Sequence, residues 1–455
     1  MTPSLLPPDD PLRHALHDEA HARPAATIRL PALVVYLAVR HEGVARGAQL
    51  AHLRELPGQA GLPDDALDNQ FLRLKLESGT LKWERHSEFT RYSLVQSLPE
   101  GVGLENPAHS LHAQLAVPEG WLARVPGLSL VALQLVMLPM PEGSPRELLE
   151  NARRWFEGHP VVASAIGRVP APAAGATPGG GHSVAITDFR LDAGGFEKML
   201  VLCGPGTSET RAGRISQRLL ELETYRLMAL LGLPAAKTLG PELGAAETQL
   251  ARLTARFDTR ETTDQALLDE LVTLAARLER ATAQHAYRFA ATQAYDAVMQ
   301  QRLAELRETP VPGWQTLGEF LQRRQAPAIA TVAATARRLE GLAARVERAS
   351  GLLRTRVDIA TEVQNQQLLA KLAQGQALQL RLQATVEGLS IAAITYYVVS
   401  LLLYGAKAAQ AAGVPINAEV AAGALLPLVV FGVWRSTRGI QQRLVRRGVA
   451  DVDAP

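Results

Sequence analysis

Two uncharged apolar runs near the C-terminus constrain this chain more than any other feature of its sequence. Residues 388–404 read GLSIAAITYYVVSLLLY and residues 420–434 read VAAGALLPLVVFGVW, without Asp, Glu, Lys, Arg or His. Each run is shorter than the ~20 residues that cross a bilayer, but the flanking Ala and Gly residues bring both into the accepted range. The runs therefore predict a transmembrane hairpin over 388–434. The alternative is a pair of helices buried in a soluble core.

The charges that flank the runs predict how the hairpin is oriented. Five arginines follow the second run: Arg435, Arg438, Arg443, Arg446 and Arg447. The connector 405–419 contains one cation, Lys407. Because Lys and Arg are enriched on the cytoplasmic side of membrane segments, we expect the connector outside and the basic tail 435–455 in the cytoplasm. The N-terminus has no basic, apolar signal peptide pattern, so it is expected in the cytoplasm too.

Residues 207–387 have the composition of helices, with many Ala, Leu, Arg, Gln and Glu residues. We expect helices over 208–232, 242–257, 262–308 and from 316 onward, separated at prolines. From 337 to 387 no proline occurs, and apolar residues recur mostly every three or four positions. This pattern predicts a long coiled-coil-like stalk that continues into the first membrane run. Its expected partner is another copy or the helix 262–308.

Residues 28–206 predict an α+β or mixed α/β domain. Apolar and alternating segments predict strands at 32–39, 71–77, 80–85, 88–96, 128–138, 183–189 and 196–204, and short helices at 45–56 and 145–157. Turn signals at Ser78-Gly79 and His86-Ser87 make 71–96 an antiparallel meander. The composition of 170–181 predicts a flexible surface loop.

Charge and cysteine content exclude several classes of partner. Lys and Arg total 47 against 45 Asp and Glu, a formal net charge of +2, which gives no basic field for nucleic acid. The single cysteine, Cys203, cannot form an intrachain disulfide or a zinc knuckle. The folded part therefore fits a reducing compartment.

The N-terminal polar segment 1–27 contains a candidate metal site. His14, His17 and His21 are three and four residues apart, so a helix would place them on one face. Imidazoles in that arrangement would bind Zn²⁺ or another borderline metal. The alternative is a solvated or packed polar helix without a ligand.

Charged and aromatic residues are dense between Lys82 and Tyr92. Strand alternation predicts Trp83, Arg85 and Arg91, with Phe89, on a common side, where they would form a ligand face. The alternative is a set of cross-strand ion pairs on a solvated sheet. The stretch from Gly204 to Arg214 follows a strand and opens a helix, where a phosphate would bind. It lacks the P-loop ending, so Thr207 or Ser208 is better interpreted as a helix N-cap.

The first membrane helix has a polar face. Ser390, Tyr397, Ser400 and Tyr404 follow one another at steps of seven, three and four residues, and Lys407 continues the series. Such a face contacts protein or water, not lipid. It either lines a pore made by several copies or hydrogen-bonds between packed helices.

Several segments resemble an uncharacterised bacterial family of membrane-anchored proteins, the domain of unknown function 3422 family. The strings that carry the resemblance are DEAHARP, LKWERHSEFTRY, RAGRISQRLLELETYRLMALLGLP and LQATVEGLSIAAITYYVVSLLLYGAK. The resemblance implies a bacterial inner membrane location and brings no established activity.

The architecture is also similar to that of the CorA-type magnesium transporters, which carry an aromatic residue followed by Gly-Met-Asn at the outer end of the first membrane helix. Here the string is Tyr404-Gly405-Ala406-Lys407. A ring of lysines would repel divalent cations. This similarity therefore implies a fold and an oligomer more than magnesium transport.

These observations predict a multi-pass membrane protein that faces the cytoplasm, a homo-oligomeric scaffold or sensor that binds a partner or small ligand. The alternative is an ion-conducting oligomer with the polar face toward its axis. A metal-dependent enzyme that uses the three histidines is a third hypothesis. No catalytic residue and no cofactor can be assigned from the sequence.

Overall fold

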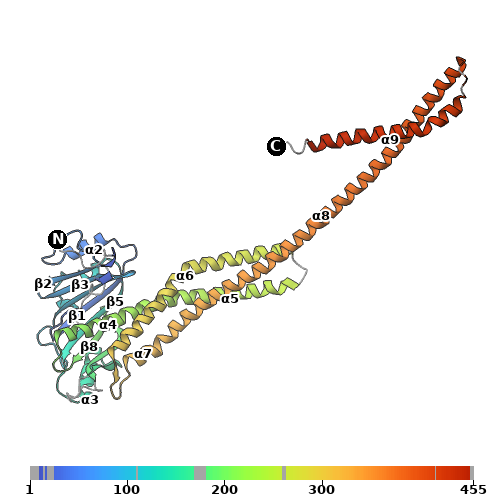
Figure 1. Ribbon diagram of the computed structural model, residues 1–455. Coiled ribbons are helices and arrows are strands. Elements are labelled where there is room, and N and C mark those ends of the chain that lie inside the picture. Colours follow the sequence, from blue (N-terminus) through green and yellow to red (C-terminus); the bar gives the residue numbers. More distant parts are fainter. Residues whose placement is uncertain are drawn as a thin grey trace, which may run out of the picture. The chain divides into compact units, whose positions relative to one another are not determined.

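The computed structural model describes residues 10–13, 16–17, 25–108, 111–168, 181–258, 263–413, 415 and 417–450. The chain divides into two compact units, Met1–Ser350 and Gly351–Pro455. The first unit combines a large sheet with helices, and the second consists of helices (Figure 1). The predicted fold class, an α/β domain followed by long helices and an apolar C-terminal helix, is confirmed.

The described residues form one sheet in the order β2-β3-β4-β1-β5-β8-β7-β6-β9. Its strands are β1 (Ala32–Arg40), β2 (Phe71–Leu76), β3 (Gly79–Arg85), β4 (Phe89–Ser97), β5 (Leu128–Pro139), β6 (Val162–Arg168), β7 (Gly181–Leu191), β8 (Glu197–Cys203) and β9 (Thr309–Pro310). Strands β2, β3 and β4 form the predicted antiparallel meander. The β5 and β8 pair is parallel. Strands β6 and β9 are additions to the predicted set.

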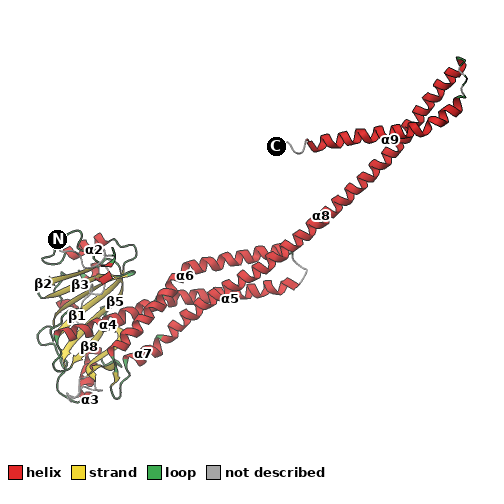
Figure 2. Ribbon diagram, viewed as in Figure 1, coloured by secondary structure: helices red, strands yellow, loops and turns green. Residues whose placement is uncertain are grey.

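Both faces of the sheet are buried, as strand β1 shows. Leu33 and Val35 belong to the apolar core on one face, and Val34 and Tyr36 belong to the core on the other. A nearly continuous apolar run such as ALVVYLAV is typical of a strand that is covered on both sides. The sheet is therefore the middle of three layers (Figure 2).

Short helices cover the first face and long helices the second. The first face is covered by α2 (Arg46–Arg54) and α3 (Pro145–Arg153), with the 3₁₀ turns Leu111–Gln114, Leu122–Arg124 and Arg154–Phe156 nearby in the chain. The second face is covered by α4 (Glu209–Leu230), α6 (Asp264–Leu306) and α7 (Leu317–Arg324). Ala212 and Leu219 of α4 are fully buried there. Helix α4, which follows the predicted boundary at 206/207, belongs to the same compact unit as the sheet.

Helix α5 (Gly232–Ala255) corrects the predicted break between 232 and 242. Helix α4 ends at Leu230, and α5 begins two residues later and contains Pro241. Pro234 is the third residue of α5, where a missing N–H costs no helical hydrogen bond. Gly232 allows close packing, because a Cβ there would lie 2.3 Å from Thr292 Oγ1 of α6.

Helix α8 (Ala326–Ala411) is the longest element, and α9 (Ala418–Ala450) follows it. Up to residue 350, α8 lies beside α5 and α6 in the first unit (Figure 1). Leu339, Leu342 and Val346 are buried there, and Arg338 Nη2 lies 2.8 Å from Glu247 Oε2 of α5. The remainder of α8, from Gly351 on, belongs to the second compact unit. The short turn Arg256–Asp258 follows α5.

Candidate functional site

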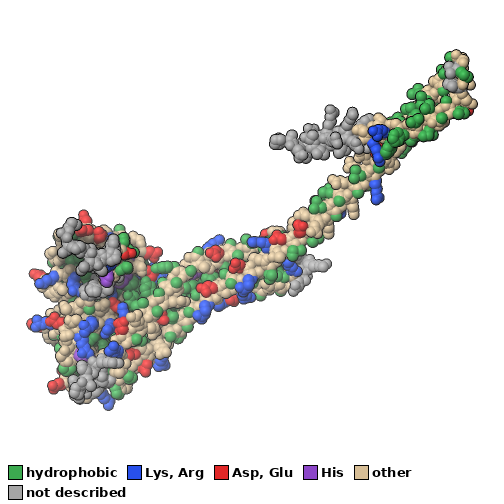
Figure 3. Space-filling view, in the orientation of Figure 1, with side chains coloured by type: hydrophobic (Ala, Val, Ile, Leu, Met, Phe, Trp, Pro, Cys, Tyr) green, Lys and Arg blue, Asp and Glu red, His purple; other side chains and the backbone are tan. Residues whose placement is uncertain are grey.

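Helices α8 and α9 contain the two predicted membrane runs, and both are long and apolar enough to cross a membrane. The most apolar stretch of the first helix is 0% buried inside the protein, and that of the second helix is 6% buried. Hydrophobic side chains cover the surface of this hairpin (Figure 3). The alternative prediction, a pair of helices in a soluble core, does not describe these exposed segments.

The two helices of the hairpin cover one side of each other. On α9, Ala418 and Ala422 are 3% and 7% exposed, and Val429 and Val433 are half-buried at the following turns. Small residues at the start of α9 allow the helices to approach closely. The half-buried residues of α8 in this segment include Ile391, Thr395, Val398, Leu403 and Ala406. They define the side of α8 that α9 covers.

The polar residues predicted on the first membrane helix lie on the uncovered side of α8. At 100° per residue, the sector that contains Ser390, Tyr397 and Tyr404 is centred roughly 165° from the covered side. Tyr397 and Tyr404 are 67% and 68% exposed. Ser400 is half-buried at the edge of this sector, and Lys407 is exposed. Ser390 Oγ donates to Val386 O at 2.8 Å, so its hydroxyl is satisfied within its own helix.

The arginines that set the predicted orientation lie in α9. Arg435 and Arg438 are exposed, and the Arg438 guanidinium stands 4.2 Å from the centre of the Trp434 ring. This cation–π contact places charge next to the aromatic residue that ends the second run. Three further arginines belong to the part of α9 whose side chains are not described: Arg443, Arg446 and Arg447.

The proposed metal site falls largely outside the described residues. His14 and His21 are not described, and His17 is exposed. Within the described part of the chain, no group of three His, Cys, Asp or Glu side chains is arranged to hold a metal ion. The three-histidine site therefore stays a prediction.

The predicted ligand face on strands β3 and β4 is wrong in its geometry. Glu84 is paired with Arg91 across the two strands, so Arg91 lies on the opposite side of the sheet from Trp83 and Arg85. Trp83 is fully buried in the first-face core. Arg85 Nη1 donates to Gln49 Oε1 of α2 at 3.0 Å. The prediction failed because equal spacing along one strand says nothing about the register across a hairpin.

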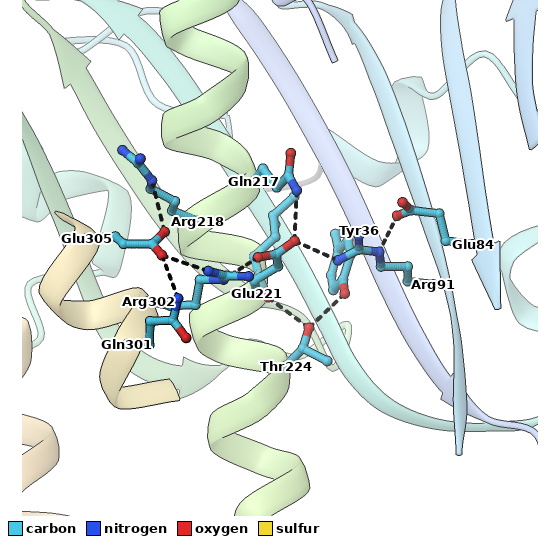
Figure 4. Close-up of polar contacts among 11 residues, drawn as sticks. Tyr36, Glu84, Arg91, Gln217, Arg218, Glu221, Thr224, Gln301, Arg302 and Glu305 are labelled. Carbon is cyan, nitrogen blue, oxygen red and sulfur yellow. Dashed lines mark hydrogen bonds and ion pairs between the residues drawn. The ribbon is translucent and has the colours of Figure 1, made fainter. Parts of the chain in front are cut away.

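Arg91 instead belongs to a buried ion network (Figure 4). It pairs with Glu84 of β3 and lies 3.2 Å from Glu221 of α4. Lys82 lies 3.0 Å from Glu84. All four side chains are less than 10% exposed. The alternative interpretation of this segment, cross-strand ion pairing, therefore describes Glu84 and Arg91, although the pair is buried and not solvated.

The network continues from the sheet to the helices. Arg302 Nε of α6 donates to Glu221 Oε2 at 2.6 Å, and Arg302 Nη1 donates to Glu305 Oε1 at 2.9 Å. Arg218 of α4 lies 3.5 Å from Glu305. Positive and negative groups thus alternate from β3 to α6.

Electrostatics favours the charged state of the network. Burial raises the pKa of Glu84 and of Glu221, but their polar partners together outweigh it and both pKa values are lowered. Arg91 acts on both groups, with Lys82 at Glu84 and with Gln217 and Arg302 at Glu221. Burial alone would lower the pKa of Arg91, yet its carboxylate partners raise it. This network cross-links the sheet and the helix layer. Its charged side chains form ion pairs with one another.

The start of α4 is capped by the protein itself. Ser208 Oγ accepts from Arg211 N at 3.3 Å, and Thr207 Oγ1 donates to Gly204 O at 2.6 Å. The N-cap interpretation of Ser208 is therefore confirmed. Gly213, in the second turn, lies against the backbone before β1, because a Cβ there would stand 1.6 Å from Ala26 O.

Comparisons with known proteins identify the family. No curated protein and no solved structure matches the chain significantly. These two comparisons therefore give no support to the predicted similarity with CorA-type transporters. A family model described as "Protein of unknown function (DUF3422)" matches residues 8–444, which is nearly the whole chain. The chain therefore belongs to the DUF3422 family.

Proposed function

We propose that this protein is a membrane-anchored homo-oligomer in which a cytoplasmic α/β unit serves as a scaffold or sensor. In this proposal the hairpin of α8 and α9 is embedded in the bacterial inner membrane with both chain ends in the cytoplasm. Its partners are the lipid bilayer, further copies of the chain and a small ligand or ion, and not nucleic acid. No catalytic activity is proposed.

One observation carries the proposal: a single face of α8 changes polarity within the membrane run. The face, here called the α8 seam, advances in steps of three or four residues through Leu378, Leu382, Val386, Leu389, Ala393, Tyr397, Ser400, Tyr404 and Lys407. Its members lie within a sector of about 120°. The seam is apolar before the run and carries hydroxyl groups within it.

The seam is mismatched to its surroundings on both sides of the boundary. Leu378, Leu382 and Val386 are 61%, 60% and 64% exposed outside the run. Burial of such a side chain stabilises by roughly 1.5–3 kcal/mol. Within the run, hydroxyl groups face lipid unless another helix covers them. A partner helix that covers the whole seam removes both mismatches.

A second copy in parallel orientation fits this requirement. Parallel copies place leucine against leucine before the run and hydroxyl against hydroxyl within it. An antiparallel partner of the same kind would place apolar groups against the hydroxyls. Parallel pairing also keeps every basic tail on the same side of the membrane.

The mass of the full chain in detergent, measured by light scattering, tests the proposal. We expect an oligomer that Leu382→Glu dissociates and that Leu380→Glu leaves intact. Leu380 is a matched control, because it is 67% exposed and lies on the other side of the helix. A monomeric wild-type chain contradicts the proposal.

The alternative is an ion-conducting oligomer, and the hydroxyl groups on the uncovered side of α8 favour it. In that case Tyr397, Ser400 and Tyr404 line the axis and Lys407 stands at its outer end. Ion flux in liposomes that depends on Tyr397 and changes with Lys407→Asn would support conduction. Absence of flux from an oligomeric protein supports the scaffold or sensor.

A further inference from the structure

A pocket of about 360 Å³ opens in the first unit between the edge of the sheet and two helices. Strand β6 and His182 of β7 form one side of it. Helix α4 contributes Arg211, Arg214 and Arg218, and the end of α6 contributes Glu305 and Arg307. The volume is within the range of pockets that hold small organic ligands.

The lining of the pocket is strongly cationic. Arg211, Arg214 and Arg218 follow one another at steps of three and four residues, so α4 presents all three on one face. Arg307 is the C-cap of α6 and has a left-handed backbone conformation, with φ of 50°. It lines the pocket at the end of this helix. Four guanidinium groups therefore meet one carboxylate, Glu305.

The charge of Glu305 is already balanced. Its carboxylate contacts Arg218 at 3.5 Å, Arg302 at 2.9 Å and the amide of Gln301 at 3.1 Å. Among the described residues, by contrast, the side chains of Arg214 and Arg307 have no hydrogen bond or ion pair. Arg214 and Arg307 thus bring positive charge to the pocket that Glu305 does not neutralise.

The titration of the lining groups is consistent with that excess. Burial and the charge of Arg214 lower the pKa of Arg211. Burial and the charge of Arg211 lower the pKa of His182, which is 8% exposed. The lowered pKa favours the neutral His182 ring, which offers a hydrogen-bonding group beside the guanidinium groups, with Nδ1 2.9 Å from Ser183 Oγ.

One wall of the pocket is apolar. Ile166, Ile215 and Leu306 line it and are 1%, 8% and 2% exposed. Gly167, which also lines the pocket, has a φ of +77°, a backbone conformation that residues with side chains rarely adopt. A ligand that fills the pocket therefore has both an anionic part and an organic part.

We propose that this pocket binds a small organic phosphate, with the phosphate held by Arg211, Arg214 and Arg307 and the organic part against the apolar wall. Planar guanidinium groups pair with phosphate oxygens through two parallel hydrogen bonds, which suits a site built from several arginines. This inference names a ligand class for the sensor in the proposed function. Only the biological role of binding rests on that proposed function. Binding itself is independent of the oligomeric state.

Isothermal titration calorimetry on the full chain in detergent tests the inference, with ribose 5-phosphate, inorganic phosphate and citrate as probes at constant ionic strength. We expect ribose 5-phosphate to bind most tightly. Arg214→Gln and Arg307→Gln should each weaken its binding by at least about tenfold, because each removes a charge-assisted hydrogen bond. Neither change breaks an ion pair of the described residues, and circular dichroism checks the fold of each variant.

The matched control is Arg323→Gln, which removes one exposed positive charge from α7 of the same unit. It should change the affinity by less than about twofold. Equal affinity in all three variants, or no binding of ribose 5-phosphate, overturns the site. Citrate binding as tight as that of ribose 5-phosphate overturns the phosphate class, and equally tight binding of inorganic phosphate overturns the organic part. None of these binding results changes the outcome of the light-scattering measurement, so the pocket and the oligomer are tested separately.

Discussion

Arg91 of strand β4 lies 3.2 Å from Glu221 of helix α4, and both side chains are almost completely buried between the sheet and the helices. This ion pair joins segments that are 130 residues apart in sequence. Its contribution to stability depends on what remains when one partner is removed. A buried carboxylate without its cation is far more costly than the intact pair is favourable.

We expect Arg91→Met to lower the free energy of unfolding by about 3–5 kcal/mol, because Glu84 and Glu221 both lose a buried partner. Urea unfolding of the full chain, followed by the fluorescence of buried Trp83 and Trp121, measures the loss. Arg338→Gln is the control, since its pair with Glu247 is 43% and 35% exposed. That change should cost no more than about 1 kcal/mol. Equal losses in the two variants would show that burial is not decisive.

The buried carboxyl group of Glu197 in β8 should make the stability of the fold depend on pH. Burial and the neighbouring charge of Glu223 raise the pKa of Glu197 well above its ordinary value. The folded protein therefore keeps this proton while the unfolded chain releases it, so stability is full below the unfolded pKa and is lost as pH rises toward the folded pKa. Glu197→Gln should raise the melting temperature more at pH 8 than at pH 5. A constant difference between the two pH values argues against this assignment.

Gly213 should not tolerate a side chain. In Gly213→Ala the new methyl group would stand 1.6 Å from Ala26 O, so either α4 or the segment before β1 must move. We expect a clear loss of thermal stability. Gly341→Ala in α8 is the control: a Cβ there meets nothing within 4 Å, and the change should stabilise the helix by about 0.5–1 kcal/mol. A neutral Gly213→Ala would contradict the close approach.

Thiol labelling in intact cells tests the orientation of the hairpin. Asn417→Cys lies in the connector and should react with a membrane-impermeant maleimide, whereas Ser436→Cys, after the second run, should react only in permeabilised cells. Cys203 should not interfere, because burial raises the pKa of its thiol to about 12 and leaves it 1% exposed. The reverse labelling pattern would place the basic tail outside.

Local patterns predicted the fold where the signal lies within one segment. The apolar run of β1 and the turn signal at Ser78-Gly79 are sufficient for a buried strand and a meander. Strand β6 was missed because Ala163, Ser164 and Gly167 lack the β-branched composition of strands. It is held by pairing with β7 and β9, which no local pattern reports.

For the candidate sites too, the sequence predicted what one segment determines and missed what depends on contacts between segments. The spacing of Ser390, Tyr397 and Tyr404 predicted a shared face because one helix sets it. The position of Arg91 depended on the register across a hairpin and was wrong. The cationic pocket joins β6, α4 and the end of α6, and the steps between Arg211, Arg214 and Arg218 were its one local signal. Arg307 gave no signal, because its approach to α4 is a product of the tertiary fold.

Cysteine cross-linking along the α8 seam tests the central claim, a parallel homo-oligomer, most directly. The measurement compares Leu382→Cys with Leu380→Cys in native membranes after mild oxidation. In a parallel oligomer, equivalent seam residues of two copies meet across the interface within reach of a disulfide. We predict efficient dimer formation for Leu382→Cys and little for Leu380→Cys. Equal cross-linking at the two positions, or none at Leu382→Cys, would contradict the account.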